Sequence, residues 1–331
     1  MVRSSARLAG AAVLAVLFLP CLNVIAQEQT PAAPPAQDVP PAGSPAPSAP
    51  VFPKPNPADF TATTPTKEVV AAFMQANLGF DNDNIWQIQA IQKTQVEGIS
   101  KVTVLIGDKT GKQQPYRFAF FTTPDGKHII VGDKIVAFGE KPFAEYRTLL
   151  QQRANGPSHG AAAKDLMLVE FADFQCPHCK AAQANMEKLL ADFPKARIVF
   201  QNDPIASIHP QSVTAAAYGT CVAKEGGSTA FFQFAGVVFD GQDGLNSADG
   251  ATLTLNSAVT KAGLDPAKIA TCAASPETKA AVDASVQLAS DVNISSVPAL
   301  MVNGRQIPAN APYETLKQII QFQAKLDGVA Q

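Results

Sequence analysis

The sequence predicts a larger α/β domain over residues 164–331, preceded by a small α+β domain over residues 61–150. Three observations carry this prediction. The apolar run 166–172 has the length of a buried strand, and a helical pattern follows it at once. The dipeptide Asn303-Gly304 between two apolar runs is a strong signal for a two-residue β-hairpin. Short runs of alternating apolar residues in the first domain are typical of antiparallel strands.

The second domain is expected to follow the order strand, helix, strand, a long helical stretch, two strands and a last helix. Its first helix is predicted from apolar residues at helical spacing between Met186 and Phe193, and it should end before Pro194. The expected elements are, in order, 166–172, 177–193, 197–202, 208–292, 298–303, 305–307 and 312–326.

The first domain is expected to hold one helix and four strands. Val69, Val70, Phe73 and Met74 fall on one face of the helix. The expected strands are 86–91, 102–106, 116–120 and 128–131. The domain contains no cysteine and no cluster of catalytic residue types, so we expect a role in binding or assembly. A boundary of small residues is expected over 151–163.

The N-terminus has the layout of a secretory signal peptide over residues 1–26. Arg3 and Arg7 precede an apolar run, and the run ends near a plausible cleavage site at Ala26. Cleavage there would remove one of the five cysteines, and the even number left suits disulfide chemistry in the periplasm. The net charge of −2 gives no electrostatic basis for binding nucleic acid.

Alternatives remain for this leading part of the chain. The apolar run would serve as a membrane anchor if it stayed uncleaved, although it is short for a bilayer. Cys21 would suggest a lipoprotein, but Pro20 before it fits that processing site poorly. Residues 27–60 are rich in proline and alanine, so we expect a disordered, extended linker that acts as a tether or a passive spacer.

The motif Cys176-Pro177-His178-Cys179 stands between the first strand and the first helix of the second domain. Pro177 suits the first helical turn, which places Cys176 at the helix N-cap. Free N–H groups and the positive end of the helix dipole favour a thiolate there. His178 adds a positive charge or a hydrogen-bond donor. Cys179 lies one turn further, within reach of a disulfide, so the motif predicts a reactive dithiol.

Other interpretations of the cysteines stay open at this point. A single pair of this spacing is also found as half of a zinc site or as a structural disulfide, although the other cysteines are too far apart in the sequence to complete a zinc site. Cys221 and Cys272 are expected to bond to each other and to fasten the helical stretch. The alternative is that they are two buried free thiols.

The segment 170–179 resembles the active-site segment of the DsbA family, whose dipeptide between the cysteines is the same Pro-His. The segment 295–300 matches that family's cis-proline loop in position. The resemblance starts at Lys164 and implies a thioredoxin fold with a helical insertion, here preceded by a small α+β, cystatin-like domain. It implies a cis bond before Pro298, where sequence alone favours trans. Val297 would then offer its backbone to the substrate main chain.

Two polar residues are further candidates for a role at this site. Glu170 lies in an otherwise apolar strand, and burial of a carboxylate usually raises its pKa. It matches the buried acid of the DsbA family, which implies that it accepts a proton from Cys179; the alternative is an edge residue facing water. His209 starts the helical stretch, where a place near the active site and a role in helix entry are both open.

The segment 124–132 resembles the strand region of the dimerisation domain of the DsbC and DsbG isomerases. The resemblance implies that residues 61–150 pair two chains into a homodimer; the alternative is a monomeric accessory domain. The Pro-His dipeptide points to an oxidase and the extra domain to an isomerase. The direction of exchange therefore stays open.

We thus expect an exported thiol–disulfide oxidoreductase that exchanges a Cys176–Cys179 disulfide with cysteines of folding proteins. Its expected partners are cysteine-containing client proteins and a membrane or periplasmic redox partner, without cofactor, metal or nucleic acid. The alternative is a non-catalytic protein, either a thiol-based metal carrier or a holdase chaperone. The lack of a Met-rich or His-rich tract weighs against the metal carrier.

Overall fold

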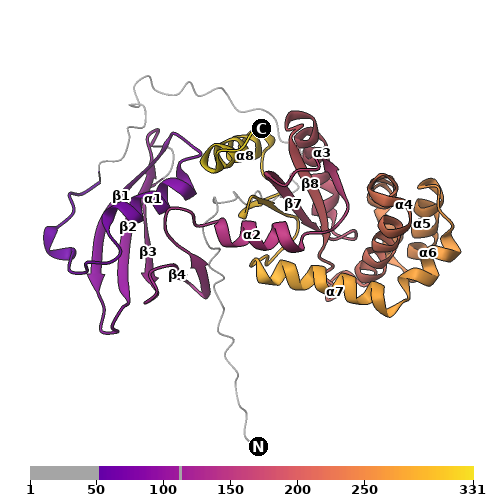
Figure 1. The fold of residues 1–331 in the computed structure, drawn as a ribbon, viewed down its shortest axis with the longest axis horizontal. Coiled ribbons are helices and arrows are strands. Elements are labelled where there is room, and N and C mark those ends of the chain that lie inside the picture. Colours follow the sequence, from indigo (N-terminus) through magenta and orange to yellow (C-terminus); the bar gives the residue numbers. More distant parts are fainter. Residues whose placement is uncertain (1–51, 112–113) are drawn as a thin grey trace, which may run out of the picture. The chain divides into compact units, whose positions relative to one another are not determined.

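The computed structural model describes residues 52–111 and 114–331. They form two compact units, each considered separately (Figure 1). The first unit reaches Glu140, except that residues 76–81 belong to the second, which continues from Lys141 to Gln331. The expected signal peptide and the expected linker up to residue 51 lie outside the described residues.

The first unit is a five-stranded antiparallel sheet whose strands follow each other in chain order. Its strands are β1 (Asn84–Lys93), β2 (Ser100–Asp108), β3 (Tyr116–Thr122), β4 (His128–Val131) and β5 (Lys134–Ala137). The helix α1 (Lys67–Leu78) sets Phe73 on the sheet, with ring centroids 5.9 Å from Phe120 and 5.0 Å from Phe138. The four expected strands and the helix are confirmed, and β5 is an addition that the sequence pattern did not predict.

The expectation of disorder up to residue 60 is wrong at its end. Residues 57–59 form a short 3-10 helix capped by Asn56, whose side chain accepts from the Ala58 N–H at 3.1 Å. Phe60 then bridges to Ile91 on β1. The backbone groups of this segment thus gain partners on the sheet, which proline content alone does not reveal.

The second unit holds a mixed five-stranded sheet in the order β10-β9-β7-β8-β6. Its elements are α2 (Ala144–Arg153), β6 (Ser158–Gly160), β7 (Leu166–Ala172), α3 (Pro177–Asp192), β8 (Ala196–Asn202), α4 (Ser212–Asp240), η2 (Gln242–Asn246), α5 (Ala248–Lys261), α6 (Pro266–Ala273), α7 (Pro276–Asp291), β9 (Ala299–Val302), β10 (Arg305–Pro308) and α8 (Tyr313–Asp327). The central β7 runs parallel to β8 and antiparallel to β9. The expected element order is confirmed.

The fully buried strand β7 divides its side chains between two cores. Leu166 and Leu168 join residues of α3 and α8 in one cluster. Met167 and Val169 join residues of α2 and α7 in the other. Because side chains alternate along a strand, Glu170 faces the same side as Leu168, which is the side of α3. The sheet is therefore covered by helices on both faces, and the buried carboxylate of Glu170 lies on the face covered by α3, the helix that begins at Pro177.

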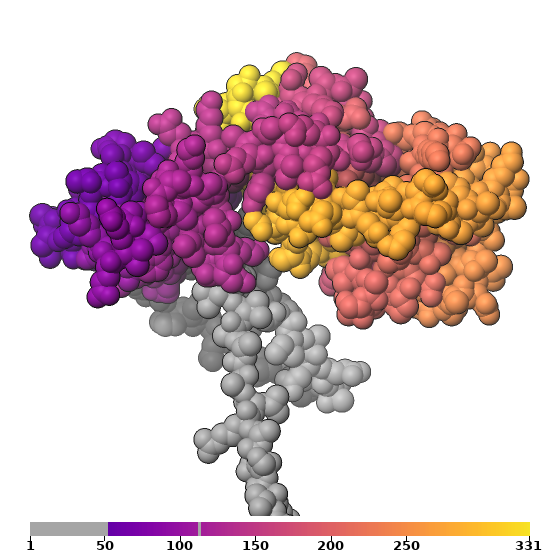
Figure 2. Space-filling view, turned by 60° about the horizontal axis from the view of Figure 1, so that its bottom comes forward, coloured from indigo at the N-terminus to yellow at the C-terminus, as the bar shows by residue number. Residues whose placement is uncertain are grey.

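The helices α4 to α7 lie between β8 and β9 in the chain and form the expected helical insertion. Figure 1 shows α4, α5 and α6 gathered at one end of the second unit, and the orange part of Figure 2 shows them as a continuous body with α7. Their core is built on phenylalanines such as Phe231 and Phe234, and it includes Phe174, Cys176 and Cys179. Apolar residues of the insertion thus pack in the same core as the cysteine pair.

The expected boundaries between the domains need correction. The units divide at residue 140 instead of 150, and residues 151–163 are not a linker. Leu150 on α2 is buried in one core of the second unit. Within the supposed linker, β6 pairs with β8 through Ser158 opposite Val199. Small residues and a glycine-proline step suggested a loop, but an edge strand needs few large side chains.

Candidate active site

Cys176 and Cys179 stand where the sequence places them, at the start of α3. Cys176 is the N-cap, with extended φ and ψ of −80° and 119°, and Pro177 follows at the first helical position. Both cysteines are free thiols. Cys176 keeps 5% of its surface exposed whereas Cys179 keeps none, so Cys176 is the more accessible of the two thiols. His178 is exposed beside it.

Cys179 lies in an apolar environment that opposes its ionisation. Burial raises the pKa of the Cys179 thiol well above its ordinary value, and the nearby Cys176 and Glu170 raise it further. One interaction acts in the other direction, because the Asp173 N–H donates to the Cys179 Sγ at 3.4 Å and lowers this pKa. The two thiols are therefore unequal: one at a helix N-terminus with access to solvent, the other buried and protonated.

The loop before β9 faces the outer thiol. The peptide bond between Val297 and Pro298 is cis, as the family resemblance implies. The Cys176 thiol points at the carbonyl oxygen of Val297, 4.0 Å from its Sγ. Segments 121 residues apart in the chain are thus brought together at the cysteine pair.

Glu170 is buried at 3% exposure, which excludes an edge residue facing water. Burial raises its pKa to about 7, and the hydrogen bond that its Oε1 accepts from the Gln183 Nε2 at 2.9 Å partly offsets this. The same Gln183 amide donates to the backbone oxygen of Cys179 at 3.1 Å. A carboxyl group that titrates near neutral pH thus lies next to the buried thiol, as a proton acceptor requires.

The turn that carries Cys176 is held by three polar side chains that the sequence analysis did not single out. Asp173 accepts from the Gln175 N–H at 2.7 Å. Gln175 reaches the insertion, accepting from the Gln211 N–H at 2.8 Å. Gln242 donates through one amide nitrogen to the carbonyl oxygens of Phe174 and Cys176, at 2.8 and 3.0 Å.

His209 lies near the active site and also contacts the start of the helix that follows it, so both alternatives left open by the sequence apply. Its Nδ1 lies 2.8 Å from the Asp173 carboxylate. Its backbone oxygen also accepts from the Ser212 hydroxyl at 2.7 Å, where α4 begins. The sequence offered one signal for the first contact, an aspartate next to the cysteine motif, but it gave no indication that the histidine folds back onto it.

The matching family model, described as thioredoxin, covers residues 152–322, slightly more than half of the chain. The chain belongs to the thioredoxin family. Its fold, with a central mixed sheet and a cysteine pair at the start of a helix, is therefore the one that the sequence predicted.

Individual relatives of this thioredoxin-family chain are distant. A Na(+)/H(+) antiporter NhaA 3 from Salinispora tropica is 28% identical over 147 residues, which are 44% of this chain and 21% of the antiporter. The chain thus spans about a fifth of that relative's length.

Two solved structures are similar over about half of the chain. A periplasmic thioredoxin-like protein from Salmonella enterica is 22% identical, with a TM-score of 0.46 over 55% of this chain and 97% of the other. A thioredoxin-like oxidoreductase from Silicibacter pomeroyi is 23% identical, with a TM-score of 0.47 over 54% and 98%.

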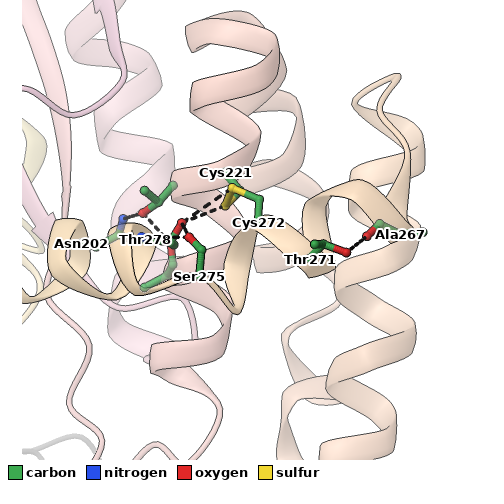
Figure 3. Close-up of a disulfide and its surroundings, with 9 residues drawn as sticks. Asn202, Cys221, Ala267, Thr271, Cys272, Ser275 and Thr278 are labelled. Carbon is green, nitrogen blue, oxygen red and sulfur yellow. Dashed lines mark hydrogen bonds between the residues drawn. A yellow bond between two sulfur atoms is a disulfide. The ribbon is translucent and has the colours of Figure 1, made fainter.

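The second cysteine pair of this thioredoxin-family chain is bonded. Cys221 on α4 and Cys272 on α6 form a disulfide with a Cα–Cα distance of 6.0 Å, which confirms the expected pairing (Figure 3). The Thr278 hydroxyl lies 3.3 Å and 3.6 Å from the two sulfur atoms, and it accepts from the Ser275 hydroxyl at 3.1 Å. This disulfide lies within the insertion, joining two of its helices.

Within residues 52–111 and 114–331, no group of three or more His, Cys, Asp or Glu side chains is arranged to hold a metal ion. Over the same described ranges, every helix is too short or too polar to span a bilayer.

Proposed function

We propose that the protein is a thiol–disulfide oxidoreductase that exchanges a Cys176–Cys179 disulfide with cysteines of client proteins. The observation that carries the proposal is the inequality of the two thiols. Cys176 caps a helix and reaches solvent, while Cys179 is fully buried beneath it. An incoming thiolate is thereby directed to one sulfur, and the other serves as leaving group or resolving thiol.

The exchange proceeds in two steps. A client thiolate attacks Cys176 Sγ, the new client–Cys176 bond forms, and the Cys176–Cys179 bond breaks with its electron pair on Cys179. A second client thiolate then attacks the client sulfur of the mixed disulfide and expels the Cys176 thiolate. The client loses two electrons and two protons, and the protein gains them as a dithiol.

Three neighbours support these steps. Glu170, buried behind Cys179, takes up or returns the Cys179 proton, because its pKa of about 7 lets it do both near neutral pH. The backbone of Val297 lies against Cys176, where it can pair with the client main chain. His178 adds positive charge next to the Cys176 thiolate when it is protonated.

The proposal places the protein in the periplasm, after removal of the basic and apolar N-terminal segment. The Cys221–Cys272 disulfide supports this location, because such bonds persist in oxidising compartments. A disulfide-bearing redox partner would restore the Cys176–Cys179 disulfide by the same exchange run in reverse. Client proteins and that partner both carry cysteines.

The experiment is oxidation of a reduced, unfolded test protein by the oxidised full chain. We expect Cys176→Ala to abolish the reaction. We expect Cys179→Ala to accumulate a mixed disulfide when it is offered the client in its disulfide-bonded form, because the Cys176 thiolate then attacks the client disulfide, displaces one client thiolate and has no Cys179 to resolve the product. Both variants retain the Cys221–Cys272 disulfide and serve as controls for each other. Full oxidation of the client by Cys176→Ala would contradict the proposal. Client protection without exchange, or metal retained through purification, would instead favour the holdase or the metal carrier.

The first unit supports a second proposal, that two copies of the chain associate through it. The strand registers place Phe121 opposite Ile130, and Ile130 opposite Ile135, so these three side chains form a row on one face of the sheet. Phe121 is 40% and Ile135 58% exposed. We call this row the apolar row. A dimer would pair two reactive sites and suit isomerisation of client disulfides as well as oxidation.

A further inference from the structure

Asp173 uses every polar group it has to hold the active-site turn. Its carbonyl oxygen accepts from the Cys176 N–H at 3.1 Å. Its carboxylate accepts from the backbone N–H groups of Gln175 and Ile205, at 2.7 and 2.8 Å. Its own N–H donates to the Cys179 Sγ at 3.4 Å. One residue therefore connects the outer cysteine, the buried cysteine and the loop that leads into α4.

The carboxylate of Asp173 is completely buried, and the His209 ring is its only side-chain partner among the contacts described above. Their separation is 2.8 Å, and the ring itself is mostly buried. A buried carboxylate needs such a donor, because an unpaired charge in an apolar site is costly. Asp203 lies nearby, where burial raises its pKa to about 6 and repulsion from Asp173 adds to that effect. The His209 ring thus adds a side-chain contact to the two backbone N–H groups that already hold this carboxylate.

We propose that His209, through Asp173, is a positioning residue for the thiolate that forms on Cys179. The His209 ring fixes the Asp173 carboxylate, the carboxylate fixes the turn, and the turn holds the Asp173 N–H on the Cys179 Sγ. This inference rests on the proposed exchange and adds a residue, 36 positions away in the chain from Asp173, that touches neither sulfur.

The influence of His209 is expected on one step of the exchange, the cleavage of the Cys176–Cys179 bond. When a thiolate attacks Cys176, the Cys176–Cys179 bond breaks and the electron pair moves to Cys179, where burial disfavours the charge. A backbone N–H aimed at that sulfur stabilises the developing thiolate and improves the leaving group. Loss of His209 frees the Asp173 turn, so the N–H no longer meets the sulfur at the moment of bond cleavage.

The test is the rate at which reduced glutathione opens the Cys176–Cys179 disulfide of the full chain. We expect His209→Ala to slow this step about tenfold, the size of a lost hydrogen bond to a charged group. His209→Asn places an amide nitrogen near the Nδ1 position and should restore the rate to within about twofold. His128→Ala removes the histidine of another pair, 2.8 Å from Asp125, in the first unit, and should leave the rate unchanged.

A second measurement separates positioning from general damage. In a Cys179→Ala background, alkylation of Cys176 by iodoacetamide should proceed at the same rate whether His209 is intact or replaced by alanine. An unchanged glutathione rate in His209→Ala would overturn the inference, and so would equal slowing of the alkylation. If wild type itself failed to react with glutathione, the proposed exchange would be wrong, whatever the variants did.

Discussion

At the scale of single residues, the site separates two tasks that one thiol could not perform together. A good entry point for a client must be accessible, and Cys176 keeps some exposed surface at the N-cap of α3. A good resolving thiol must be close but sheltered, and Cys179 is fully buried. Glu170 then connects the buried thiol to proton exchange, at a cost to folding that can be measured.

Because a buried Glu170 destabilises the folded chain when it is ionised, we predict a pH-dependent change in the free energy of unfolding for Glu170→Gln in the dithiol form. The pKa of Glu170 rises from 4.5 to about 7 on folding. Between these values the folded chain holds a proton that the unfolded chain has lost, so stability falls as the pH rises through this window. Glutamine removes the penalty. We expect it to raise the free energy of unfolding by roughly 3 kcal/mol at pH 8 and to change little at pH 4.

Urea unfolding at the two pH values measures this difference. Glu187→Gln is the matched control, since Glu187 lies exposed on the same helix that covers Glu170. Equal effects of the two substitutions, or a larger gain for Glu170→Gln at pH 4 than at pH 8, would show that Glu170 is not held in a raised-pKa environment.

At the scale of elements, local patterns predicted what depends on neighbours in the chain. The run 166–172 became β7, and Asn303 and Gly304 form the hairpin turn with φ of 47° and 91°. No local sequence pattern predicted the contacts between segments that are distant in the chain. Gln242 reaches the cysteine turn from 66 residues away, and His209 reaches Asp173 across a loop. Such polar contacts between distant segments depend on tertiary packing, which the periodicity of apolar residues in the sequence does not reveal.

The Cys221–Cys272 disulfide joins α4 to α6 and gives a prediction for these elements. It closes a loop of 51 residues, and the loss of chain entropy in the unfolded state corresponds to about 4 kcal/mol of stability. We expect Cys221→Ala with Cys272→Ala to lower the free energy of unfolding by about that amount. The variant and the reference protein that keeps the Cys221–Cys272 disulfide should both carry Cys176→Ala and Cys179→Ala, so that the active-site thiols cannot exchange with this disulfide. A loss below about 1 kcal/mol would mean that the insertion's core, rather than the disulfide, holds these helices.

At the scale of the whole molecule, the two units divide the proposed work. The second contains the cysteine pair and its supporting residues, and the first contributes an exposed apolar row but none of the groups that hold the active-site turn. The proposed thiol–disulfide exchange by itself would need only the second unit. An apolar row exposed on three neighbouring strands is unfavourable in water and suits contact with another protein surface. A role of the first unit in assembly therefore stays a prediction, and the apolar row is the surface on which it can be tested.

A charge placed in the apolar row tests this role on the full chain. We expect wild type to sediment as a dimer, and Phe121→Glu with Ile135→Glu to shift it to a monomer, because two buried carboxylates would face an apolar partner surface. Leu253→Glu is the matched control, since Leu253 is exposed on α5 in the second unit. The monomer should still oxidise client thiols but lose the ability to rearrange scrambled disulfides. A wild-type monomer, or a dimer that survives both substitutions, would exclude the apolar row as the interface.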